Sequence, residues 1–445
     1  MNNNVTKILT WFVIGLIFIL SAFGIYKYLS GKSNTTPQTV GSDSAFPTSD
    51  NISTSYNPDS NGYNNGGGSQ VPKTSGLVTT TSDNKTLSGT NSIVKTISDK
   101  PVSGSMFIER LDPATKQKNL FVRFMEREGG HLNEISWGDT APHKISNTTT
   151  TRVYQTYFNN TGDNVLMRRL SDSDIIENIL ATLPTPKIQQ ISTSTPVGFE
   201  DIISKLTQTP LSSNIKEVAV SPSKSKIFYL TAVDNDYVGT TESFGGQKSG
   251  KQQVWSSPIG EWQVDWPKEN TILFNTKPSA SLPGYIYSLN LDTKDFSKIM
   301  GDVNGLTSKA SPDLKKLIYS ESTDTSMHTY VYDLTTRKQT LLPIKTLPEK
   351  CVWGGIERNL LYCAVPSSIT DGIYPDDWYQ GLVSFDDEVW QIDTNTGNTT
   401  ILANKDLLDR SGGIDVDNIQ LSPSEDYLIL NNKKDLSLWM VKLPK

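Results

Sequence analysis

The sequence is poor in the side chains that most often perform catalysis or bind metals. Its 445 residues include three histidines and two cysteines. His131, His143 and His328 do not have the spacing of a metal-binding motif. The Gly-x-Ser-x-Gly motif of hydrolase nucleophiles is also missing from the sequence. The sequence therefore predicts no metal site, no cofactor and no nucleophilic enzyme of these kinds.

Dense runs of lysine or arginine are likewise missing. The chain has 41 basic and 47 acidic residues, a formal net charge of −6 and a pI of about 5.3. A protein that binds nucleic acid needs a basic surface to neutralise the phosphates. We therefore expect no nucleic-acid partner.

One apolar segment lies near the start of the chain. Residues Ile8–Tyr26 form a run of 19 residues without a charge, which is long enough to cross a hydrocarbon core of about 30 Å as a helix. We expect residues 1–32 to be an N-terminal transmembrane anchor. A cleaved signal peptide is the alternative, because Ala22, Phe23 and Gly24 resemble a cleavage site.

The basic residues around this segment define its orientation weakly. Lys7 lies on one side, and Lys27 and Lys32 lie on the other. Long C-terminal domains cross the membrane largely regardless of so small a bias. We expect a single-pass membrane protein whose C-terminal domain is extracytoplasmic.

Residues 33–92 have the composition of a linker. They contain six charged residues, and Ser, Thr, Asn, Gly and Pro dominate the rest. Such a segment has too little apolar surface to offset the loss of chain entropy on folding. We expect a disordered linker here, followed by a single folded domain at 93–445.

That folded domain contains a repeat. Pro222, Pro267 and Pro312 recur at intervals of 45 residues, Gly355 follows after 43 residues, and Pro423 follows after a longer interval. Each marks a tight turn between two strand-like runs, because proline presets φ at the first turn position. A period in the forties built from strands predicts an all-β fold, a β-propeller.

A second signature supports the same period. An apolar residue precedes an aromatic one at Ile286–Tyr287, Val331–Tyr332, Val389–Trp390 and Leu438–Trp439. We expect these pairs on the third strand of each blade, with Val254–Trp255 as a partial copy. A β-sandwich with similar hairpins is the alternative.

The last blade has three expected strands, and Ile93–Ser98 is placed to supply the fourth and close the ring. Strands at 121–127, 132–136 and 144–147, with a turn at Asp112, would then belong to the first blade. This count gives seven blades, and six is the alternative.

The turns also carry a family resemblance. Ser311–Pro312–Asp313, followed by two lysines and an aliphatic–aromatic strand, resembles the repeats of TolB-type and dipeptidyl-peptidase-like propellers. Only the turns and third strands match, and the usual glycine after the aspartate is replaced by Leu314, Lys224 and Glu425. The whole chain also resembles uncharacterised bacterial proteins with one anchor, a polar linker and a propeller. These resemblances imply no catalytic residue.

The two cysteines flank one of the turns. Cys351 and Cys363 fall on the first and second strands of one blade, and a symmetric hairpin places them opposite each other. We expect a disulfide, which suits an exported protein, with two buried thiols as the alternative.

A segment between the second and third strands of that blade is the expected binding site. It interleaves aromatic residues with carboxylates, a combination that suits a sugar, a basic peptide or Ca²⁺. Packing of the same side chains onto the blade is the structural alternative. The candidate ligand-binding residues are Tyr374, Asp376, Asp377, Trp378, Tyr379, Asp386 and Asp387.

Two functions remain open. The first is a non-enzymatic binding or scaffold module for a protein, peptide or glycan of the cell envelope. The second is an envelope hydrolase or lyase that uses carboxylates at the mouth of the propeller, which requires two of them around one pocket. The segment Gly245–Gln252 is interpreted as a flexible loop, because it lacks the final Ser or Thr of a phosphate loop. Asp234–Asp236 is interpreted as a turn, because Val238 and Gly245 stand where a calcium loop requires ligands.

Overall fold

The computed structural model describes residues 92–112, 115–184, 204–245, 250–355, 359–408 and 412–444. The anchor expected at Ile8–Tyr26 and nearly all of the expected linker lie outside the described residues. No helix within the described ranges is both long and apolar enough to span a membrane.

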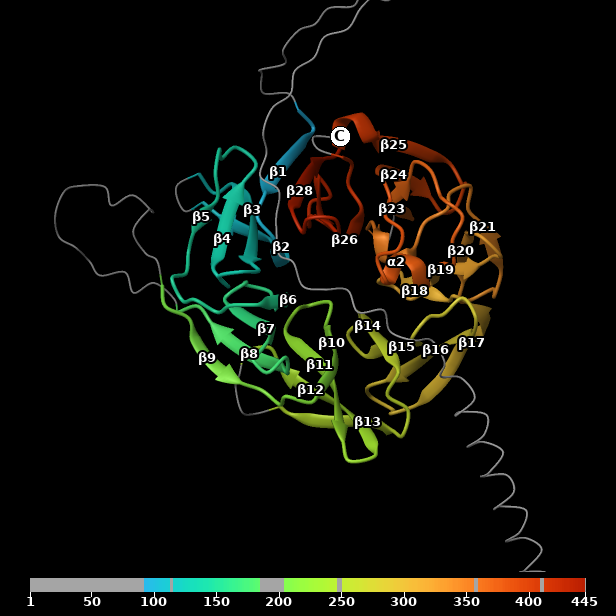
Figure 1. Ribbon diagram of the computed structural model, residues 1–445, viewed down its shortest axis with the longest axis horizontal. Helices are drawn as coiled ribbons and strands as arrows, with labels where there is room; N and C mark the ends of the chain where they lie inside the picture. The colour runs from blue at the N-terminus through green and yellow to red at the C-terminus, as the bar shows by residue number, and fades with distance from the viewer. Residues whose placement is uncertain are drawn as a thin grey trace, which may run out of the picture. The chain divides into compact units, whose positions relative to one another are not determined.

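The described chain forms seven antiparallel sheets of four strands each, arranged around a common axis (Figure 1). Blades 1 to 3 are β2 (Val102–Leu111), β3 (Lys118–Glu126), β4 (Leu132–Ser136), β5 (His143–Lys144); β6 (Val153–Phe158), β7 (Asn164–Leu170), β8 (Ile176–Thr182), β9 (Thr207–Pro210); and β10 (Ile215–Val220), β11 (Lys226–Val233), β12 (Asp236–Ser243), β13 (Gln252–Ser257).

Blades 4 to 7 continue in the same order from the innermost strand outward, except that the outermost strand of blade 7 comes from the start of the folded chain. They are β14 (Trp262–Lys268), β15 (Thr271–Thr276), β16 (Pro283–Asn290), β17 (Phe296–Asn304); β18 (Thr307–Ala310), β19 (Lys316–Ser322), β20 (Met327–Asp333), β21 (Gln339–Leu341); β22 (Cys351–Trp353), β23 (Leu360–Pro366), β24 (Asp387–Asp393), β25 (Thr399–Ala403); and β26 (Val416–Leu421), β27 (Tyr427–Asn432), β28 (Leu438–Lys442), β1 (Val94–Ser98).

The fold is thus a seven-bladed β-propeller, and the count of seven rather than six is confirmed. β1 pairs with β28, so the expected closure by Ile93–Ser98 is also confirmed. One strand assignment was wrong. Val254–Trp255 lies on β13, the outermost strand of blade 3, and the third strand of that blade is β12. The apolar–aromatic pair misled because it also occurs on an outer strand.

The hydrophobic core consists of separate apolar clusters that lie between the blades. Within the described residues, seven apolar clusters each join two neighbouring blades, including the contact of blade 7 with blade 1. An eighth cluster lies beneath the segment between β23 and β24. Three short helices complete the elements of the described residues: η2 (Pro348–Lys350), α2 (Asp376–Tyr379) and α3 (Lys405–Leu408).

Candidate functional site on the insertion face

The alternation of strands gives the propeller two different faces. Because neighbouring strands are antiparallel, the innermost strand of each blade begins at the same face at which the second strand ends. The segment between β23 and β24, with helix α2, therefore lies on this face. We call the segment 367–386 the insertion and this side of the propeller the insertion face. Figure 1 shows α2 on the inner side of the ring.

The insertion is fastened to blades 4 and 5. The hydroxyl of Ser322 on blade 5 donates to the backbone carbonyl of Tyr374, and the Gly372 N–H donates to the Thr325 carbonyl at 3.0 Å. The Asp376 carboxylate accepts the Ala280 N–H of blade 4 at 2.7 Å. Tyr374 and Trp378 are 1% and 3% exposed. The insertion is therefore a packed part of the fold.

A buried lysine lies under the insertion. Lys350, at the end of η2, is fully buried, and its Nζ lies 2.7 Å from Asp387 Oδ2 and 2.6 Å from Asp415 Oδ1. The same Nζ lies 5.0 Å from the centre of the Trp378 ring and 4.8 Å from that of Phe385. One ammonium thus links the insertion to the start of blades 6 and 7.

Asp415 is held by several donors. The Trp378 Nε1–H donates to both of its carboxylate oxygens, at 3.0 and 3.1 Å, and the backbone N–H of Phe385 donates to Oδ2 at 3.1 Å. Burial opposes ionisation of this carboxyl, but Lys350 and these hydrogen bonds outweigh it and lower its pKa. At Asp387 burial dominates over Lys350 and raises the pKa to about 6.

The structure separates the four candidate carboxylates. Asp376 accepts the Ala280 N–H, Asp377 Oδ2 accepts the Ile373 N–H at 2.8 Å, Asp386 pairs with Lys434, and Asp387 pairs with Lys350. Each carboxylate thus serves a different local partner. Trp378 and Asp387 come together around Lys350, whereas Asp377 and Asp386 do not join them.

Tyr379 is the candidate aromatic residue with the most exposed surface. Its side chain is 38% exposed, and its hydroxyl donates to Glu349 Oε1. The hydroxyl also interacts with the Gln263 side chain of β14. Tyr379 therefore connects the insertion to the innermost strands.

A group of polar side chains begins at this tyrosine, in helix α2, and its other members are on or directly before the innermost strands of blades 4 to 6. We call it the axial cluster; its members are Gln263, Asp265, Lys309, Glu349 and Tyr379. Lys309 interacts electrostatically with both Asp265 and Glu349. Within the described chain, however, no carboxylate oxygen lies within ion-pair distance of its Nζ. The Trp353 Nε1–H donates to the Lys309 carbonyl at 3.1 Å and holds the backbone.

Burial disfavours the charged forms in this cluster. It raises the pKa of Asp265 and Glu349 and lowers that of Lys309, and the attraction between the opposite charges offsets only part of the effect. Among the described residues, Glu349 Oε2 has no hydrogen-bond partner. On β10 of the next blade, burial likewise raises the pKa of Glu217 to about 7.

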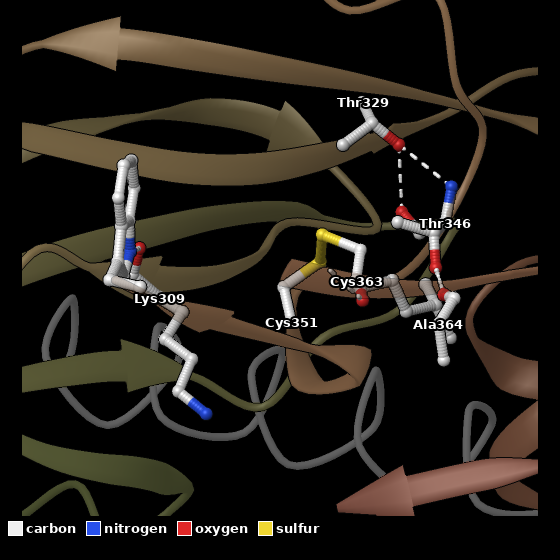
Figure 2. Close-up of a disulfide and its surroundings, with 8 residues drawn as sticks. Lys309, Thr329, Thr346, Cys351, Cys363 and Ala364 are labelled. Carbon is white, nitrogen blue, oxygen red and sulfur yellow. Dashed lines mark hydrogen bonds between the residues drawn. A yellow bond between two sulfur atoms is a disulfide. The ribbon is translucent and has the colours of Figure 1, made fainter. Parts of the chain in front are cut away.

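The two cysteines are joined on blade 6. Cys351 on β22 and Cys363 on β23 are register partners with a Cα–Cα distance of 4.0 Å, and their sulfurs form a disulfide. Beside it, Thr346 accepts from Thr329 through its carbonyl and donates to the Ala364 carbonyl at 2.6 Å (Figure 2). Figure 2 also shows Lys309 extending away from the disulfide, with no other drawn side chain at its nitrogen.

The described residues contain no group of three or more His, Cys, Asp or Glu side chains that could hold a metal ion. Asp234 lies in the turn between β11 and β12, but β12 begins at Asp236, so most of the calcium-loop-like segment Asp234–Gly245 is a strand. Of the segment Gly245–Gln252, Gln252 is the first residue of β13, and residues 246–249 lie outside the described residues.

No local sequence pattern points to the buried lysine, and only one points to the axial cluster. Lys350 and its partner Asp415 are 65 residues apart, and Asp265 and Lys309 lie on different blades. A charged residue inside an apolar innermost strand, as in Val264–Asp265–Trp266, is the one pattern that points to this group.

The chain resembles several solved structures at low sequence identity. It matches an oligogalacturonate lyase in complex with manganese with a TM-score of 0.44 and 9% identity, over 78% of this chain and 97% of the other. The match to the tricorn protease has a TM-score of 0.46 and 10% identity, and covers 79% of this chain and 34% of the protease. A protein from Agrobacterium tumefaciens designated TolB matches with a TM-score of 0.32 and 13% identity, over 53% and 80% of the two chains. No protein-family profile and no curated protein matches the chain.

Proposed function

We propose that this chain is a non-enzymatic binding module of the bacterial cell envelope. Residues Ile8–Tyr26 anchor it in the membrane, and the propeller lies outside the cytoplasm, where its insertion face engages a protein, peptide or glycan. Tyr379, Asp377 and Asp386 contact the partner. The other candidate residues, Tyr374, Asp376, Trp378 and Asp387, hold the insertion in its bound shape.

The observation that carries this proposal is the combination of a fixed backbone with exposed apolar side chains on the insertion. Ile373 and Leu382 are 52% and 71% exposed, and Tyr379 is 38% exposed. The buried anchors Tyr374 and Trp378 lie between them in the sequence. A loop that is already ordered loses little conformational entropy on binding. Loops fixed on a rigid scaffold are also where binding residues concentrate.

The binding test compares two exposed leucines on opposite faces. Full-length protein in lipid nanodiscs is incubated with a membrane and cell-wall extract of its own host, and the retained protein and glycan are quantified. We expect Leu382→Ala on the insertion to reduce retention at least tenfold. Leu111→Ala, at the 59%-exposed end of β2 on the other face, leaves retention unchanged. Retention that depends on Leu111 and not on Leu382 would place the binding surface elsewhere.

The membrane placement has its own test. Intact cells that carry the full chain with an N-terminal tag are treated with a protease that cannot cross the membrane. We expect the propeller to be removed from the cell surface while the tag stays protected. A protected propeller, or a tag missing from the mature protein, contradicts the proposed anchor.

A further inference from the structure

The two most exposed large apolar side chains of the described residues both lie on the insertion face. Leu382, in the insertion, is 71% exposed, and Leu282, in the connection between β15 and β16, is 65% exposed. That connection joins the second and third strands of blade 4, as the insertion does in blade 6. Ile373 in the insertion is a third exposed apolar side chain. Single exposed apolar residues are normal on a protein surface, but several together indicate a contact with a partner.

Two aspartates join the backbone segments that carry these side chains. The Asp376 carboxylate accepts a backbone N–H of the connection that contains Leu282, at 2.7 Å. The next residue, Asp377, accepts the Ile373 N–H through its side chain and the Leu382 N–H through its carbonyl, each at 2.8 Å. Leu282, Ile373 and Leu382 are therefore held on one hydrogen-bonded framework, and we call them the apolar patch.

The backbone around the apolar patch is rich in carboxylates. The connection between β19 and β20, which is hydrogen-bonded to the insertion, adds one aspartate to those of the insertion itself. Asp324 on that connection and Asp371 in the insertion are exposed, and neither forms an ion pair within the described residues. The insertion contains no lysine or arginine, and its acidic residues are Asp371, Asp376, Asp377 and Asp386.

The basic side chains on the neighbouring segments are already engaged. Lys277, at the start of the connection between β15 and β16, pairs with Glu261 at 2.7 Å, and Lys434 pairs with Asp386. The Lys433 ammonium lies 4.7 Å from the centre of the Trp378 ring and donates to the carbonyl of that residue. The surface at the apolar patch thus keeps an uncompensated negative charge.

This combination favours one class of partner. Lysine and arginine carry an aliphatic stem and a cationic end, so they cover apolar surface and pair with carboxylates at the same time. A second copy of this chain would bring like charges together, and anionic lipid head groups would be repelled in the same way. A neutral or acidic glycan offers no cation to the carboxylates.

We propose that the apolar patch, with Asp324 and Asp371 beside it, is the docking site for a basic amphipathic segment of a partner protein. In such a segment, aliphatic side chains cover the apolar patch, and lysine or arginine side chains pair with the two aspartates. This inference rests on the proposed function as a binding module and assigns the class of its partner.

The experiment measures peptide binding to the full chain in nanodiscs of zwitterionic lipid, with empty nanodiscs as the blank. Three labelled peptides of equal length are titrated by fluorescence anisotropy: one of leucine and lysine, one of leucine and glutamate, and one of serine and lysine. We expect only the leucine–lysine peptide to bind. Leu282→Ser and Leu382→Ser should each weaken its binding at least tenfold, because each removes apolar surface that the peptide covers.

The charged residues are tested by salt. Asparagine at both Asp324 and Asp371 should weaken binding of the leucine–lysine peptide several-fold at low salt and make the remaining binding less sensitive to salt, because salt screens exposed charges.

Two substitutions on the opposite face are the matched controls. Leu111→Ser changes the exposed end of β2, and Asp292→Asn changes an exposed carboxylate in the turn between β16 and β17. We expect both control proteins to bind the leucine–lysine peptide like the wild type. The melting temperature of every variant is measured to show that it is folded.

The outcomes separate this inference from the proposed function. Equal binding of the leucine–glutamate peptide overturns the basic partner, and binding that survives both leucine substitutions overturns the site. A wild-type dimer that Leu382→Ser dissociates assigns the apolar patch to a second copy and also overturns the inference. If no peptide binds but retention from the extract still depends on Leu382, the docking inference fails and the binding module stands. If retention does not depend on Leu382 either, both proposals fail.

Discussion

At the scale of single residues, the best-defined electrostatic feature is Lys350. This side chain is fully buried and compensates two buried carboxylates, Asp387 and Asp415. Removing one partner of a buried ionic group leaves charge uncompensated and costs about 3–5 kcal/mol. We expect Lys350→Met to lower the free energy of unfolding by roughly that amount at pH 8, measured by chemical denaturation of the full chain.

A surface lysine provides the control. Lys434 pairs with Asp386 on the same face, but the two side chains are 29% and 54% exposed. Exposed pairs contribute about 0–1 kcal/mol, so Lys434→Met should change stability little. The loss in the Lys350→Met protein should also shrink toward pH 5, because the uncompensated carboxylates then take up protons. Equal losses in the two variants would mean that the buried lysine is not required for stability.

The raised pKa of Glu217 predicts how the stability of the folded protein depends on pH. Burial raises its pKa in the folded protein to about 7 from the ordinary value of 4.5. The folded state therefore holds the proton more tightly than the unfolded state, and stability falls as the pH rises from about 4.5 to about 7. Glu217→Gln removes this loss.

We expect the Glu217→Gln protein to become more stable than the wild type by on the order of 1–3 kcal/mol at pH 8, with a smaller difference at pH 5. Thermal and chemical denaturation at several pH values measures the difference between the two proteins. A difference that does not change with pH would show that ionisation of Glu217 is not coupled to folding.

At the scale of elements, the turns explain why the strand order could be predicted. Each turn between an innermost and a second strand is encoded by adjacent residues, so local chemistry was enough to find it. The replacement of glycine by Leu314, Lys224 and Glu425 did not abolish these turns. All three residues adopt left-handed backbone, with φ of 56°, 53° and 54°. Side chains other than glycine tolerate this conformation at a modest energetic cost.

The position of the insertion could be predicted from the sequence, but the roles of its side chains could not. Its position between the second and third strands of blade 6 and the opposition of Cys351 and Cys363 followed from hairpin geometry. The burial of Trp378 and Asp387 did not, because it depends on Lys350 and Asp415, which are supplied by other elements. Local sequence therefore identified the segment, while the role of each side chain was set by contacts between blades.

At the scale of the whole molecule, the ring is closed by its first strand. β1 pairs with β28, and its two buried apolar side chains belong to different contacts between blades. Val94, 2% exposed, lies in the cluster between blades 6 and 7, and Ile97, 3% exposed, lies in the cluster between blades 7 and 1. The stability of both contacts is therefore tied to a strand that comes from the start of the folded domain.

This arrangement predicts that damage to β1 destabilises the propeller as a unit. Ile97→Ala in the full chain should cost about 2–5 kcal/mol, the range for deleting a buried aliphatic side chain. The chain has nine tryptophans, so Trp255 and Trp262, in blades 3 and 4, are followed individually by their 19F resonances in protein labelled with fluorotryptophan, and they report on a distant part of the ring. We expect that signal to melt at a lower temperature in the variant, in one transition that coincides with loss of β-structure by circular dichroism.

Thr96→Ala, on the same strand but only partly buried, should shift the melting temperature much less. If the tryptophan signal instead melts at the wild-type temperature after an earlier separate transition, β1 is an edge strand that detaches alone and does not close the ring.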